Sequence, residues 1–122
     1  MSKASETWGI LVQLLLGGIA VLITSYLLPG VSVEDFLTGI VIAALIALLN
    51  ITVKPILVIL TIPITIVTLG LFLIVINALL ILLAAKIVPG FSVDGFWWAL
   101  LFGLILGLIN SLLGVSLGGK NV

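Results

Sequence analysis

Four long stretches of the chain carry no charged residue and are almost entirely apolar. They run from Trp8 to Leu28, from Phe36 to Val53, from Thr65 to Ala85 and from Phe96 to Val115. A helix of about 20 residues rises roughly 30 Å, which matches the hydrocarbon thickness of a lipid bilayer. The pattern therefore predicts an all-α integral membrane protein with four transmembrane helices.

The segment 54–64, between the second and third stretches, is bounded by prolines and is as apolar as the helices apart from Lys54. A second helix that continued through it would be roughly 43 Å long, more than a bilayer core needs. Pro55 and Pro63 each remove a backbone donor and disfavour a helical residue just before them. We expect a break near Lys54, a short interfacial or re-entrant segment, and a helix that restarts near Pro63. A kinked continuation of the second helix is the alternative.

The sequence also repeats itself at an offset of 60 residues. Residues 28–36, Leu-Pro-Gly-Val-Ser-Val-Glu-Asp-Phe, align with residues 88–96, Val-Pro-Gly-Phe-Ser-Val-Asp-Gly-Phe, and the register continues to Asn50 and Asn110. The chain therefore reads as two tandem helical hairpins, each with a Pro-Gly turn. Because two crossings separate the turns, both turns are predicted on one face of the membrane, as in a parallel repeat.

This organisation predicts a single transmembrane domain over residues 1–122. Repeat 1 covers about residues 8–53, the linker covers 54–64, and repeat 2 covers about 65–115.

Small residues recur four apart on the second helix of each hairpin. They are Gly39, Ala43 and Ala47 in the first hairpin and Gly103, Gly107 and Ser111 in the second. Small side chains let helix backbones approach closely in lipid, so these positions are predicted to pack helices together. The contact is either between the two hairpins of one chain or between protomers.

Composition excludes several kinds of chemistry. The chain is 64% hydrophobic and 7% charged, with no cysteine and no histidine, whereas soluble domains are near a quarter charged. Disulfides, Cys/His zinc sites and catalytic triads that need a histidine base are excluded. No cofactor or metal is expected. A formal net charge of zero gives no basic surface for nucleic acid.

The few charges predict an orientation. Lys3, Lys54 and Lys120 lie on one side of the predicted topology with Glu6, and Glu34, Asp35, Asp94 and Lys86 lie on the other. Cytoplasmic segments carry the excess of lysine, so both termini are expected in the cytoplasm and both Pro-Gly turns outside.

The outer-turn residues have a structural and a functional interpretation. The set comprises Ser32, Glu34, Asp35, Ser92 and Asp94. Acids where helices begin cap free N–H groups and meet the positive end of the helix dipole, and the spacing of Ser32 and Asp35 suits a capping box. A carboxylate pair for acid–base work or cation binding is the less favoured interpretation.

The two lysines near the spans and the asparagines within them are further candidates. Lys86 is expected to snorkel to the headgroups or to pair with an outer-turn acid. Lys54 is expected to anchor the inner interface, with contact to a lipid phosphate as the alternative. Asn50, Asn77 and Asn110 are expected to join helices through hydrogen bonds worth about 1 kcal/mol each, with a pore lining as the minority interpretation.

Several motifs between Gly17 and Leu113 are specific in combination. They are Asn50 to Pro55, Leu57 to Thr68 with its Thr-Ile-Pro-Ile-Thr core, Leu-Gly-Leu-Phe at 69–72, Ile-Asn-Ala at 76–78, and Pro-Gly-Phe-Ser-Val-Asp-Gly-Phe at 89–96. Together they resemble bacterial phage holin superfamily IV, the four-span holin-like proteins. The resemblance implies four crossings of a bacterial cytoplasmic membrane. The family takes its name from proteins that let lytic enzymes through the membrane, although many members are chromosomal proteins of unknown role.

Three classes of function follow from these observations. The first is a holin-like, non-catalytic protein that self-associates and changes membrane permeability or packing. The second is an accessory or structural subunit of a larger membrane complex, or an envelope-stress protein. The third, a carrier or channel, is disfavoured because no ionisable residue lies between the predicted helix ends. The expected partners are lipid, copies of the chain or other membrane subunits, and not nucleic acid.

Overall fold

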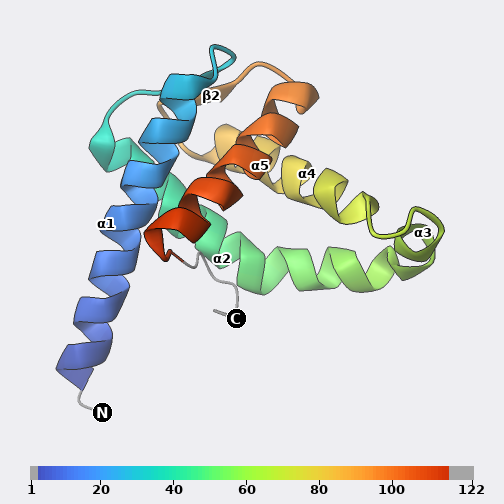
Figure 1. Ribbon diagram of the computed structural model, residues 1–122, viewed down its shortest axis with the longest axis horizontal. Coiled ribbons are helices and arrows are strands. Elements are labelled where there is room, and N and C mark those ends of the chain that lie inside the picture. Colours follow the sequence, from blue (N-terminus) through green and yellow to red (C-terminus); the bar gives the residue numbers. More distant parts are fainter. Residues whose placement is uncertain (1–2, 116–122) are drawn as a thin grey trace.

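The computed structural model describes residues 3–115, with side chains from Gly9 onward. Its elements, in chain order, are α1 (Lys3–Leu27), β1 (Val31–Val33), α2 (Phe36–Leu60), α3 (Ile62–Val67), α4 (Phe72–Ile87), β2 (Phe91–Val93) and α5 (Phe96–Leu113) (Figure 1). Three helices are long and apolar enough to cross a membrane, namely α1 from Gly9, α2 and α5, and α4 is a shorter apolar helix. A helical membrane protein is therefore confirmed, with one span shorter than expected.

The helices form two hairpins that pack on each other. α1 packs against α2, and α4 packs against α5, so each hairpin is held by its own helix pair. The hairpins meet through contacts of α1 with α5 and of α2 with α4. The far halves of α2 and α4, joined by α3, extend away from the other helices (Figure 1).

Two short strands, which the sequence did not predict, join the Pro-Gly turns at one end of the otherwise helical molecule. β1 and β2 pair antiparallel with Val31 opposite Val93, Ser32 opposite Ser92, and Val33 opposite Phe91. The ladder continues on both sides, because Glu34 N–H donates to Gly90 O at 2.9 Å and Asp94 N–H donates to Gly30 O at 2.8 Å. Extended backbone that leaves a helix needs partners for its polar groups, and each turn supplies them to the other.

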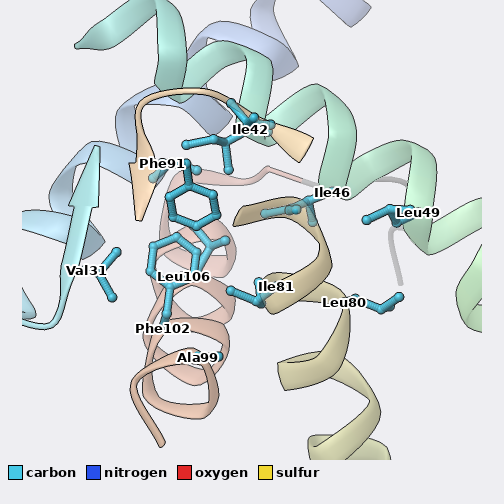
Figure 2. Close-up of a cluster of buried hydrophobic side chains, with 14 of the residues drawn as sticks. Val31, Ile42, Ile46, Leu49, Leu80, Ile81, Phe91, Ala99, Phe102 and Leu106 are labelled. Carbon is cyan, nitrogen blue, oxygen red and sulfur yellow. The ribbon is translucent and has the colours of Figure 1, made fainter. Parts of the chain in front are cut away.

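Buried apolar side chains fill the space below this sheet. Figure 2 shows the ring of Phe91 on β2 next to the ring of Phe102 on α5, with Ile42 of α2 close to Phe91. The Phe91 and Phe102 ring centroids are 5.5 Å apart and the rings are tilted by 49°. Phe102 and Ile42 are completely buried. This cluster joins both hairpins, since its members come from α1, α2, α4, α5 and both strands.

The break expected near Lys54 is wrong, because α2 continues through Pro55 to Leu60. Proline inside a helix removes one hydrogen bond, here the bond to the Ile51 carbonyl, whereas a helix end leaves up to four carbonyls that need partners. In apolar surroundings the second cost is larger. The helix ends instead at Thr61, whose N–H donates to Leu57 O at 3.1 Å.

The third span begins later than the expected Thr65. Pro63 lies in the first turn of the short helix α3, but α3 ends at Val67 and the chain turns before α4 starts at Phe72. Leu69 and Gly70 both have positive φ values, 55° and 88°. This left-handed pair reverses the chain, a geometry that the apolar pattern of the segment does not reveal.

Candidate functional site: an asparagine cavity and two paired turns

The three asparagines of the spans meet around one small cavity. Asn50 comes from α2, Asn77 from α4 and Asn110 from α5, and the cavity has a volume of about 90 Å³. Its remaining lining residues are Ile46, Ile81, Gly103, Leu106 and Gly107. The sequence predicted that each asparagine joins helices through hydrogen bonds, and it did not predict that the three share one cavity.

Asn110 carries the least satisfied polar atom of this cavity. The residue is 9% exposed, and its Oδ1 is buried and accepts no hydrogen bond within the described part of the chain. A buried carbonyl oxygen without a donor costs on the order of 1–3 kcal/mol. The cavity exceeds the roughly 30 Å³ that a water molecule occupies, so it has room for a donor to Asn110.

Gly103 makes room for Asn77. A Cβ added to Gly103 would lie 2.5 Å from Asn77 Nδ2, so the carboxamide of Asn77 rests directly on the glycine backbone. Gly103 therefore packs α5 on α4 within the second hairpin. The positions aligned with this pair in the first hairpin, Gly17 and Ala43, carry no polar side chain.

The other predicted packing residues divide into two groups. Gly39 lies against α1, since a Cβ there would be 3.1 Å from Gly18 O, and Ala43 is fully buried. Ala47 is half-buried. Gly107 and Ser111 are exposed on α5, and a Cβ on Gly107 would meet no atom within 4 Å.

Gly18 was missed as a packing residue. A Cβ on it would lie 2.8 Å from Ile40 Cγ1 and 3.1 Å from the Ile40 backbone nitrogen. Its alignment with Ala78, another small residue, is the signal that could have identified it.

Asp35 caps the start of α2. Its side chain accepts hydrogen bonds from both the N–H and the hydroxyl of Thr38, each at 2.8 Å. The backbone hydrogen bond from Thr38, followed by the hydroxyl, lowers the pKa of Asp35 below its ordinary value of 3.8. The capping box with Ser32 is wrong, because Ser32 lies in β1 opposite Ser92.

Asp94 does not cap α5, contrary to its interpretation as a helix-start residue. The N-cap is Gly95, which has no side chain, and Trp98 stands where Thr38 stands in the first hairpin. Trp98 instead covers the Pro-Gly turn at Gly30. A Cβ built on Gly30 would overlap the Trp98 indole, which supplies the three nearest atoms. This contact between α5 and the turn after α1 was missed, although Gly30 and Trp98 both belong to the repeat.

The charged residues lie at the two ends of the bundle. Lys86 is exposed in the last turn of α4, and Lys54 is half-buried on α2. Neither forms an ion pair within the described residues. The side chains of Lys3, Glu6 and Trp8, and all of Lys120, lie outside the part of the chain that the structure describes. Among residues with described side chains, no group of three or more carboxylates could hold a metal ion.

Comparison with known proteins identifies relatives over most of the chain. Residues 8–112 match the family described as mycobacterial four-transmembrane-segment phage holin, superfamily IV. An uncharacterized protein of Streptomyces coelicolor is 48% identical over 85 residues, which cover 66% of this chain and 68% of that protein. The uncharacterized membrane protein YvlD of Bacillus subtilis is 32% identical over 103 residues, which cover 84% of this chain and 87% of YvlD. No solved structure matches.

Proposed function

The chain belongs to the four-span phage holin family of superfamily IV, and from this membership we propose that it is a non-catalytic membrane protein that self-associates and alters bilayer permeability or packing. The observation that carries the proposal is the small, outward surface of α5. Gly107 and Ser111 are exposed there on the same helix as Leu104 and Leu108, which are 49% and 62% exposed. In lipid, small residues one turn apart favour close helix contact. Within the described part of the chain, no atom lies within 4 Å of a Cβ placed on Gly107, which stands at the edge of the asparagine cavity.

The two hairpins are tandem repeats related by an axis along the membrane normal. The strand register supports this arrangement, because Ser32 faces Ser92, its equivalent 60 residues later. Burial recurs at the same offset: Ile42 and Phe102 are completely buried, and Ile46 and Leu106 nearly so. Repeats of this parallel kind do not provide the inverted symmetry of alternating-access carriers.

The paired turns face the outside of the bacterial cytoplasmic membrane, and both termini face the cytoplasm. Lys54 supports this orientation: at 1.5 Å per residue it lies roughly 27 Å along α2 from Phe36, about one hydrocarbon thickness from the turns. A lysine at that depth anchors the cytoplasmic interface.

Reconstitution into dye-loaded liposomes tests the function. We expect release to rise faster than linearly with the protein-to-lipid ratio, because release needs several copies. Gly107→Leu should lower both the release and the oligomer mass in native mass spectrometry. Gly9→Leu is the matched control, since Gly9 is also a helical glycine with no atom near its Cβ position.

Vesicles that remain tight at high loading would contradict the permeability proposal. A strictly monomeric protein in native membranes would contradict self-association. Gentle extraction in complex with other membrane subunits would instead favour the accessory-subunit alternative.

A further inference from the structure

A groove runs between α4 and β2 at the end of the molecule that holds the paired turns. Its volume is about 560 Å³, within the roughly 300–1,000 Å³ of small-molecule sites. It is lined by Leu79, Leu82, Leu83, Ala85, Lys86, Phe91, Ser92 and Val93. The function proposed above makes no use of this groove.

The groove has a polar end and an apolar wall. Lys86 and Ser92 supply an ammonium group and a hydroxyl, and both residues are exposed. Leu83 and Leu79, which are 37% and 46% exposed, lie one and two turns before Lys86 on α4 and supply an apolar wall. Because α4 is an apolar helix of a membrane protein, exposed leucines on it favour contact with lipid, and an occupant that suits both ends of the groove has a polar head and an apolar chain.

The charges around the polar end distinguish between headgroups. Lys86 alone would favour an anionic lipid. However, Asp94 directly follows the lining residue Val93, and Glu34 lies against Gly90, where a Cβ would be 2.7 Å from Glu34 Oε2. These two carboxylates lie on the paired turns that flank the polar end of the groove, against its one lysine. A headgroup with both a phosphate and an ammonium group matches this mixture better than one with negative charge alone.

We propose that the groove binds a glycerophospholipid with an amine-bearing zwitterionic headgroup, such as phosphatidylethanolamine. Lys86 and Ser92 hold the phosphate, the carboxylates of Asp94 and Glu34 face the ammonium group, and one acyl chain lies along Leu79 and Leu83. No covalent step is involved.

Native mass spectrometry of the detergent-purified full chain tests the proposal. Phosphatidylethanolamine and phosphatidylglycerol with identical acyl chains are titrated in parallel, and phosphatidylethanolamine is expected to bind more tightly. Lys86→Gln should weaken its binding about fivefold, the contribution of one lysine near a lipid surface. Ala85→Phe, which fills the groove and leaves the charges in place, should weaken it as well.

Lys54→Gln is the matched control, because it removes one lysine from the end of α2 that lies away from the paired turns. This variant should leave binding unchanged. Tighter binding of phosphatidylglycerol would overturn the proposal. So would equal effects of Lys54→Gln and Lys86→Gln, or full binding by Ala85→Phe, because each would indicate general attraction at the membrane surface. Thermal unfolding of every variant verifies that it is folded.

Discussion

The contact between Gly30 and Trp98 allows a direct test of how the two hairpins are joined. Gly30 does not have a positive φ, so alanine is compatible with its backbone and Gly30→Ala acts only through the added methyl group. That methyl would overlap the indole of Trp98, which is partly buried against the core. Overpacking of this kind costs about 1–3 kcal/mol.

A double-mutant cycle isolates the contact. Trp98→Thr introduces the residue found at the aligned position, Thr38, and removes the obstacle to the new methyl. The double variant should therefore be more stable than the sum of the two single effects by about 1–2 kcal/mol. The assay is the free energy of unfolding in mixed micelles, followed by far-ultraviolet circular dichroism during titration with sodium dodecyl sulfate.

Gly107→Ala is the control for the cycle, since its methyl would meet no atom within 4 Å and should cost nothing. Strict additivity of Gly30→Ala and Trp98→Thr would refute the reasoning, because residues that do not touch have independent effects.

Three further predictions concern the core, the cap and the cavity. Phe102→Ala should destabilise the protein by about 3–5 kcal/mol in the same assay, because a completely buried ring next to Phe91 is lost; a loss below about 1 kcal/mol would contradict this packing. The ionised Asp35 cap should stabilise the fold fully above the unfolded pKa of Asp35, near 3.8, and lose this effect as the pH falls through its lower folded pKa. Asp35→Asn should therefore weaken the fall in thermal unfolding temperature at acid pH, measured in a nonionic detergent. An unchanged fall would contradict the cap. Asn110→Leu removes a buried carbonyl oxygen that accepts no hydrogen bond, so it should change the free energy of unfolding by less than about 1 kcal/mol. A loss above about 3 kcal/mol would show that Asn110 is well paired.

The sequence was sufficient for features that depend on average apolarity and was insufficient for features that depend on local geometry. The spans followed from charge-free length, and the holin-family resemblance is confirmed by the match over residues 8–112. The favoured break near Lys54 was wrong and the alternative, a second helix that continues, holds as far as Leu60. Proline rules describe the cost of a broken hydrogen bond but not the larger cost of a helix end in apolar surroundings.

The candidate site was predicted only in its parts. Asn50, Asn77 and Asn110 were each identified, but their shared cavity depends on how α2, α4 and α5 cross, which no local pattern specifies. The pairing of β1 with β2 was missed because three extended residues are too few to give a strand pattern. The aligned Pro-Gly turns were the available signal, since two equivalent turns on one face can exchange backbone hydrogen bonds.

The central claim is that the two Pro-Gly turns meet on one face of the membrane, with Ser32 opposite Ser92. The chain has no cysteine, so Ser32→Cys with Ser92→Cys introduces a single possible intramolecular disulfide. Oxidation in native membranes should give a fast-migrating monomer in nonreducing electrophoresis, because Cα atoms of such a strand pair are about 5.5 Å apart. Ser32→Cys with Ser111→Cys, at the other end of α5, should give no such species. Failure of the first pair to form the intramolecular disulfide would contradict the claim.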